Sequence, residues 1–290
     1  MRETGRPSLR TADTEGRIVT LASGKGGVGK TVLTALLGTT LAARGKRVLM
    51  VDGDMGLRDL DLVIGMEDRV LFDVFDVATG RCFEEDAILS VRPGLDLLPA
   101  SQRYRWEDIE GDAVLTVLED VRHQYDYILI DSPAGVGKGL YYTLDMADLI
   151  LLVAEPTWVS VRDTGRLMHD LHERRQFSYA LVGNRFGQSS SSLLPEVWAE
   201  SLGAERIAAI VPYTRQLAEA AQEGRLAEPQ AEGAAQAALE ALADFVETEE
   251  EQPIRYWEMW LRTVTNASAV RYLMRRRKEA RQWRRGRGYR

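Results

Sequence analysis

Short, unbroken runs of hydrophobic residues recur along the chain and are separated by longer segments with helical periodicity. The runs are Ile18–Ala22, Val48–Asp52, Leu95–Leu98, Tyr127–Asp131, Leu149–Ala154, Tyr179–Asn184 and Ile207–Val211. Continuous runs are typical of strands buried on both faces of a parallel sheet. The segments between them, most clearly Thr31–Arg44 and Val161–Arg175, can hold crossover helices. The pattern predicts an α/β fold with a doubly wound, mostly parallel sheet over residues 17–246.

The two ends of the chain depart from this pattern. Residues 1–16 are polar, which predicts a flexible lead-in and no secretory signal. Residues 247–252 have the sequence ETEEEQ and predict an acidic hinge. Residues 253–290 contain 12 Lys/Arg against 2 Asp/Glu, and three of the six tryptophans. This composition predicts a separate, basic and aromatic C-terminal helical tail.

The distribution of charge along the chain separates the tail from the rest of the protein. The 290-residue chain has a net charge of -7, but residues 253–290 carry +10 and the rest -17. The acidic body is not expected to coat nucleic acid, whereas the basic tail suits an anionic partner. The single cysteine, Cys82, excludes an internal disulfide framework and a multi-cysteine metal site. No apolar run approaches the ~20 residues of a membrane-spanning helix, so we expect a cytoplasmic protein.

The strongest chemical signal is the segment Ser23–Thr31, SGKGGVGKT, which satisfies the pattern G-x-x-x-x-G-K-[ST]. It follows a predicted strand and opens a predicted helix, as a phosphate-binding loop must. Its glycines let backbone N–H groups point at phosphate, where Lys30 would neutralise charge and the Thr31 hydroxyl would ligate Mg²⁺. The predicted nucleotide contacts here are Gly24, Lys25, Gly26, Gly27, Val28, Gly29, Lys30, Thr31 and Val32.

Two further strands end in carboxylates. Asp52-Gly53-Asp54 ends one, and Asp131, followed by SPAG, ends another. A doubly wound sheet binds ligands at the carboxyl ends of its strands, so these acids are expected beside the phosphate loop. Asp131 is predicted to support the metal, and Asp54 to orient the attacking water.

Lys25 is an additional lysine inside the loop, in KGGVGKT, which marks the deviant Walker A group of P-loop NTPases. Four other segments make the resemblance more specific: DGDMGLRDLDLVIG from Asp52, LPASQ from Leu98, DSPAGVG from Asp131 and SVRD from Ser160. Together they resemble the MinD family, ATPases that help place the bacterial division site. The resemblance runs from about Arg17 to Val246.

This resemblance implies an ATPase that uses Mg²⁺, forms a homodimer with ATP, and hydrolyses slowly until an activator completes the site. It implies that Lys25 reaches the partner's phosphates, and that Lys25, Lys30 and Asp54 are the catalytic set. Division-inhibitor and activator proteins of the Min type would be its partners. It would work peripherally at the inner face of the cell membrane.

The resemblance also assigns residues around the base. Asn184 and Arg185 match an N-R pair beside the adenine, and Pro212 matches a second base-flanking loop. The chain departs from the family at Val32, where Thr is usual, and at Asp59, where Asn is usual. Tyr213 and Thr214 stand where an acidic pair is common.

The tail has an amphipathic part. At about 100° per residue, one face collects Tyr256, Trp260, Val264, Ala267, Val270 and Met274, with Trp257 at its border. Arg271 interrupts that face, and Arg275–Lys278 is basic all round. Such a helix can lie in an anionic membrane surface, and two tails on a dimer gain avidity. Packing on a protein, or contact with nucleic acid, are the alternatives that stay open.

Two related functions compete with division-site placement. A DNA-partitioning ATPase of the ParA type would use the basic tail on phosphates, although DNA binding needs no apolar stripe. A flagellar-placement ATPase is a nearer relative that would use the tail on a protein. A GTPase is disfavoured because Gly183-Asn184-Arg185-Phe186 is not an N-K-x-D motif.

Overall fold

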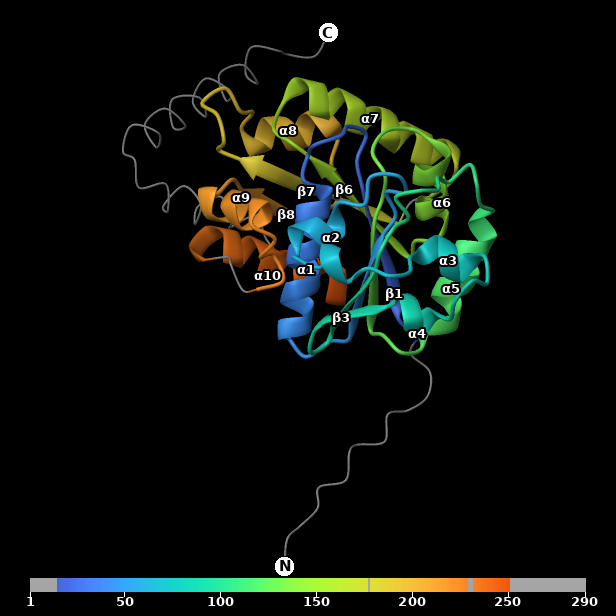
Figure 1. Cartoon of the computed structure of the whole chain (residues 1–290). Coiled ribbons are helices and arrows are strands. Elements are labelled where there is room, and N and C mark those ends of the chain that lie inside the picture. The colour runs from blue at the N-terminus through green and yellow to red at the C-terminus, as the bar shows by residue number, and fades with distance from the viewer. Residues whose placement is uncertain (1–14, 177, 229–231, 251–290) are drawn as a thin grey trace, which may run out of the picture.

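The computed structural model describes residues 15–176, 178–228 and 232–250 (Figure 1). Within these residues, eight strands form one sheet in the order β3-β4-β2-β5-β1-β6-β7-β8. The strands are β1 Arg17–Ala22, β2 Val48–Asp52, β3 Leu89–Arg92, β4 Leu95–Leu98, β5 Tyr127–Asp131, β6 Leu149–Ala154, β7 Tyr179–Phe186 and β8 Ile207–Pro212. All neighbours are parallel except β3 and β4, which are antiparallel. The predicted doubly wound, mostly parallel fold is therefore confirmed.

Helices cover both faces of the sheet. The helices are α1 Lys30–Ala43, α2 Leu60–Val63, the 3-10 turn η1 Glu67–Arg69, α3 Val74–Ala78, α4 Glu84–Ala87, α5 Gly111–Arg122, α6 Lys138–Asp145, α7 Trp158–Glu173, α8 Pro195–Leu202, α9 Arg215–Gln222 and α10 Gly233–Thr248. Residues of α1, α2, α9 and α10 pack on one face, and residues of α3 and α5–α8 on the other. This division follows from the alternation of side chains along each buried strand.

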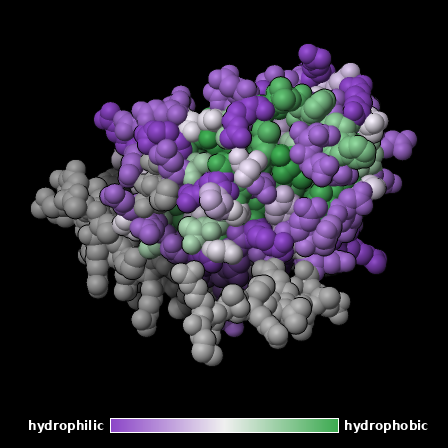
Figure 2. All heavy atoms as spheres, turned by 60° about the horizontal axis from the view of Figure 1, so that its bottom comes forward, coloured by the Kyte–Doolittle hydropathy of each residue, from purple (hydrophilic) through white to green (hydrophobic). Residues whose placement is uncertain are grey.

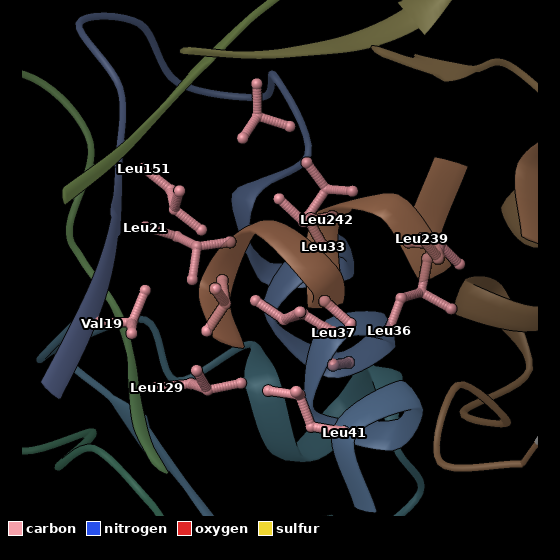
Figure 3. Packing of buried hydrophobic residues seen from close by; sticks show 14 of the residues in the cluster. Val19, Leu21, Leu33, Leu36, Leu37, Leu41, Leu129, Leu151, Leu239 and Leu242 are labelled. Carbon is pink, nitrogen blue, oxygen red and sulfur yellow. The ribbon is translucent and has the colours of Figure 1, made fainter. Parts of the chain in front are cut away.

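The core beneath α1 and α10 supports the phosphate loop. Figure 3 shows leucines of both helices, among them Leu37 and Leu242, packed toward Val19, Leu21 and Leu129 of the sheet. Helix α1 lies so close to β2 that a Cβ on Gly38 would be 2.9 Å from the sulfur of Met50. Helix α1 is thereby held against β2, and it begins at Lys30, the end of the loop that follows β1.

Helix α10 ends at Thr248, two residues past the predicted domain end at 246. Glu247 forms an ion pair with Lys46, with 3.2 Å between Oε1 and Nζ. Glu249 pairs with Arg17 and with Arg206. The first residues of the predicted 247–252 hinge thus belong to this helix and its ion pairs.

The tail residues predicted to bind membrane, Tyr256, Trp257, Trp260, Val264, Val270 and Met274, lie outside the described residues, as does most of the 1–16 lead-in. In the described ranges, no helix is long and apolar enough to cross a membrane. The face shown in Figure 2 is largely hydrophilic, with a hydrophobic area near its middle. Large hydrophobic side chains that are well exposed include Leu71, Phe83 and Trp158.

Candidate functional site

The sequence-predicted site residues gather at the carboxyl edge of the sheet, because each lies at or just beyond the end of a parallel strand. The loop Ser23–Thr31 follows β1, Asp54 follows β2, and Asp131 ends β5. Asn184 and Pro212 lie near the ends of β7 and β8. Since β1 pairs with both β5 and β6, the phosphate loop lies at the centre of this edge.

The glycines of the loop allow a backbone that other residues would obstruct. Gly27 and Gly29 have φ values of 78° and 91°, in the left-handed region. A Cβ on Gly29 would lie 2.6 Å from Nδ2 of Asn184, and one on Gly24 would overlap the carbonyl oxygen of Asp163 in α7. The loop is therefore enclosed by β7 and α7, with no room for larger residues at these positions.

Lys30 is a buried cation at the start of α1. The residue is 7% exposed, and its Nζ donates to Oγ of Ser23 at 3.1 Å. The amine lies at the N-terminus of a helix, where the first N–H groups lack carbonyl partners. The arrangement concentrates positive potential in the loop and suits a phosphate group.

Asp131 is a buried carboxylate whose surroundings suit a metal ligand. It is 2% exposed, and its Oδ1 has no hydrogen-bond partner among the described residues. Burial raises its pKa to about 7, although the Lys30 charge and a hydrogen bond from the Thr31 side chain act in the opposite direction. An unpartnered carboxylate oxygen beside a threonine hydroxyl fits Mg²⁺, which prefers oxygen ligands. Within the described residues, no group of three or more His, Cys, Asp or Glu side chains is placed to hold a metal ion.

Asp52 and Asp54 differ although they are two residues apart. Asp52 is buried and accepts hydrogen bonds from the backbone N–H groups of Asp54, at 2.9 Å, and Leu60, at 3.0 Å. Burial raises its pKa well above the ordinary value, and the nearby Asp131 adds to this. Asp54 is half-buried, and burial raises its pKa while Lys30 lowers it. Asp52 therefore shapes the loop that presents Asp54 to the site.

Two adjoining cavities extend from the phosphate loop. One of about 600 Å³ is lined by residues that include Lys30, Thr31 and Asp59. The other, of about 330 Å³, is lined by residues that include Asn184, Pro212 and Tyr213. Gly29, Val32 and Arg185 line both. The residues predicted to surround the base are thus brought together next to those predicted to hold phosphate.

Asn184 and Arg185 connect β7 to the phosphate loop. Nδ2 of Asn184 donates to the carbonyl oxygen of Val28 at 2.8 Å, and Nη1 of Arg185 donates to that of Gly27 at 2.7 Å. Arg185 has a left-handed φ of 57°. Both side chains therefore hold the loop as well as line the cavity.

Glu155 is a site residue that the sequence reasoning missed. It follows β6, and its carboxylate faces Nζ of Lys25 at 3.6 Å and Nη1 of Arg185 at 3.0 Å. Its position in the sequence could have indicated a role in the site. Glu155 directly follows the hydrophobic run Leu149–Ala154, just as Asp52 and Asp131 stand at the ends of their own hydrophobic runs. Lys25, predicted to reach a second chain, contacts an acid of its own chain here.

Comparison with known proteins shows which family the chain resembles. Residues 16–178 match the model of an AAA domain family. The septum site-determining protein MinD of Bacillus subtilis is 39% identical over 174 residues, covering 59% of this chain and 65% of that protein. MinD of Synechocystis is 37% identical over 171 residues, covering 58% and 64%. The aligned part thus spans a little under two thirds of these relatives.

Solved structures extend the similarity over most of the domain. The MinC:MinD cell division protein complex of Aquifex aeolicus matches with a TM-score of 0.74 and 34% identity, covering 82% of this chain and 98% of that one. MinD of Pyrococcus horikoshii, complexed with Mg-ADP, matches with a TM-score of 0.71 and 29% identity, covering 81% and 97%. A ParA family ATPase from Chlorobium tepidum, at 21% identity, shares the fold. The chain belongs to the MinD family of septum site-determining proteins.

Proposed function

We propose that this chain is an ATP-driven switch that binds ATP with Mg²⁺, forms a dimer and hydrolyses the nucleotide slowly, in the service of division-site placement. The observation that carries the proposal is the buried Asp131 with its unpartnered oxygen, next to Lys30 and Thr31, two residues that line the larger of the two adjoining cavities. A phosphate cradle, a metal-binding carboxylate and room for a base are what a nucleoside triphosphate requires.

The chain's residues would divide the work of phosphoryl transfer. Backbone N–H groups of Gly24–Thr31 and the Lys30 amine would hold and orient the triphosphate, and Thr31 and Asp131 would hold Mg²⁺. The metal supplies positive charge to the phosphate oxygens when bound. Asp54, next to Lys30, would orient the attacking water. Asn184, Arg185 and Pro212 would line the base cavity.

Slow hydrolysis is expected from a single chain, because phosphoryl transfer depends on charge neutralisation and alignment. Lys30 is the loop lysine buried in its own site, whereas the Lys25 side chain is 40% exposed. We propose that Lys25 of a second copy supplies the missing charge. Dimerisation and turnover would then be coupled, and an activator would raise the rate by completing the site.

Partners and location follow from the family and from the tail. The Aquifex aeolicus relative was solved as a MinC:MinD complex, which supports a division inhibitor of that kind as a partner. The basic, aromatic residues 253–290 would attach the ATP dimer to an anionic membrane. A DNA-partitioning role through the same basic residues is the competing proposal.

The nucleotide part is tested with Lys25→Ala. We expect the wild-type chain to sediment as a dimer with ATP and a monomer with ADP, and Lys25→Ala to weaken the dimer and abolish stimulated hydrolysis. Lys46→Ala is the matched control, because Lys46 pairs with Glu247 far from the loop. Unchanged turnover and sedimentation of Lys25→Ala would reject the assignment.

The membrane part is tested by co-sedimentation with anionic liposomes. Binding should require ATP and should be lost when residues 253–290 are deleted. A DNA competitor, titrated over a salt series, separates the two proposals, since phosphate-driven binding weakens steeply with salt. Retention on DNA without retention on liposomes would favour the partitioning function.

A further inference from the structure

One carboxylate connects the two cationic parts of the site. Glu155 lies between Lys25 of the phosphate loop and Arg185 of the base cavity, with its Oε2 3.6 Å from Nζ of Lys25 and its Oε1 3.0 Å from Nη1 of Arg185. The Glu155 side chain is 13% exposed, whereas those of Lys25 and Arg185 are 40% and 36% exposed. We call these three residues the Glu155 cluster.

The backbone holds Glu155 in place. Its N–H donates to Oγ of Ser160 at 2.9 Å, and its carbonyl oxygen accepts from the N–H of Thr157 at 2.8 Å. Thr157 caps α7 through a hydrogen bond from the N–H of Ser160 to its Oγ1. The carboxylate is therefore presented at a defined position beside the loop, because β6 pairs with β1, which the loop follows.

The position of Glu155 is electrostatically unexpected in a site for an anionic ligand. A triphosphate needs cations around it, and Glu155 contacts two, Lys25 of the loop and Arg185 of β7. The Arg185 guanidinium is additionally fixed by its hydrogen bond to the carbonyl oxygen of Gly27. Arg185 thus has a second anchor, whereas Lys25 is the more exposed member and lies on a glycine-rich loop. Of the two cations, Lys25 can leave Glu155 at the lower cost.

We propose that Glu155 is a positioning residue that holds Lys25 on its own chain in the nucleotide-free state and releases it when ATP brings two chains together. The inference rests on the proposed function, since it concerns the lysine that would cross between chains. Glu155 opposes dimerisation by the free energy of its contact with Lys25. It thereby raises the ATP concentration at which the switch operates.

Glu155→Gln tests this directly, because the amide keeps the shape and loses the charge. Sedimentation velocity is measured with Mg²⁺ and a non-hydrolysable ATP analogue, and compared with ADP. We expect the dimer midpoint of Glu155→Gln to fall about two- to five-fold in analogue concentration, the effect of losing a partly exposed ion pair. Glu119→Gln, which removes a carboxylate paired with Arg122 on α5, should leave the midpoint unchanged.

The outcomes separate this inference from the proposed function. A wild-type chain that stays monomeric with the analogue overturns both. A wild-type chain that dimerises while Glu155→Gln dimerises equally or less readily overturns the positioning role alone. Thermal unfolding of all three proteins is recorded alongside. If the ion pair only supports the fold, its loss in Glu155→Gln would lower the melting temperature without lowering the analogue concentration at which half of the chains are dimeric.

A zero-length carbodiimide cross-link gives a second readout on the wild-type chain. Nucleotide-free protein should yield a Lys25–Glu155 amide, identified by mass spectrometry of the digest. The ATP analogue should suppress this product, whereas ADP should not. Cross-linking that is equally efficient with the analogue would show that Lys25 stays with Glu155 in the dimer and would overturn the proposal.

Discussion

Charged side chains are paired differently at the amino and the carboxyl edges of the sheet. At the amino edge, charges are paired within the chain: Arg122 lies 2.7 Å from Asp148, and Arg17 forms an ion pair with Glu249. Arg44 contacts Asp244 at 2.8 Å. These groups are partly exposed and mutually satisfied, so they fasten α5 and α10 to the ends of the strands.

At the carboxyl edge, the chain leaves buried charges incompletely paired. Asp131 is buried with one carboxylate oxygen lacking a hydrogen-bond partner among the described residues, and the buried Lys30 amine donates to a neutral hydroxyl. Burying an incompletely paired charge destabilises a fold. A ligand that binds only the folded state returns stability by mass action. The contrast teaches that the amino edge serves the fold and the carboxyl edge is arranged for a ligand.

The largest effect is expected from Asp131→Asn in the nucleotide-free protein. Asp131 has a pKa of about 7 when folded, against an ordinary value of 3.8. The stability that its proton contributes is present below pH 3.8 and is lost as the pH rises to about 7. At pH 8 the charged group therefore costs about 4 kcal/mol, which asparagine avoids. Urea unfolding at pH 8 should show the variant to be more stable, with a smaller difference at pH 5.

Asp148→Asn is the matched change at the amino edge. Asp148 accepts from the backbone N–H of Ile18 at 2.8 Å and pairs with Arg122, so its removal should destabilise the protein at pH 8. Opposite signs for the two substitutions would support the comparison. An Asp131→Asn variant less stable than wild type at pH 8 would contradict it.

Gly29→Ala should have the next largest effect. Its φ of 91° is costly for alanine, and the new Cβ would displace Asn184 from the carbonyl oxygen of Val28. We expect a loss of about 2–3 kcal/mol in unfolding free energy and loss of nucleotide binding. Gly45→Ala is the control at the amino edge, since its φ is 81° but no atom lies within 4 Å of a Cβ there. Equal costs for both would mean that Asn184 gives way freely.

The strands could be predicted because a strand that is buried on both faces of the sheet requires a continuous run of hydrophobic residues. All the predicted strands are present, and the β6 prediction Leu149–Ala154 agrees at both ends. Strand β3 escapes this rule because its four residues LSVR lie at the sheet edge and are partly or fully exposed. Helix α7 begins at Trp158, before the predicted Val161, because Thr157 caps it.

The site could be predicted only where its residues form a local pattern. The phosphate loop is contiguous, so its residues and its place between β1 and α1 follow from the motif. The contact between Lys25 and Glu155 could not be predicted, because it depends on β6 lying next to β1 in the sheet. The pKa of Asp131 likewise arises from burial by residues distant in the chain.

Arg44→Ala should have a moderate effect, confined to the amino edge. Its guanidinium contacts Glu240, Asp244 and Glu247, so its removal leaves three carboxylates of α10 without this cation. We expect a loss of about 1–2 kcal/mol in urea unfolding, smaller at high salt. Nucleotide affinity, measured by calorimetry, should stay unchanged. A change in affinity larger than the change in stability would show that the two edges are coupled.

The smallest effect is expected from Thr214→Ala, which sharpens the comparison within the carboxyl edge. Oγ1 of Thr214 accepts from the N–H of Leu217 at 3.3 Å and caps α9, and Thr214 also lines the smaller cavity. Loss of this cap should cost about 0.5–1 kcal/mol. Thr157→Ala removes a similar cap from α7, where the hydrogen bond is 3.2 Å, without touching that cavity. Helix α9 buries only Leu217 and Ala220, so we expect its fraying to weaken nucleotide binding, by calorimetry, in Thr214→Ala more than in Thr157→Ala. Equal nucleotide affinities in the two variants would show that the cap of α9 does not contribute to nucleotide binding at the smaller cavity.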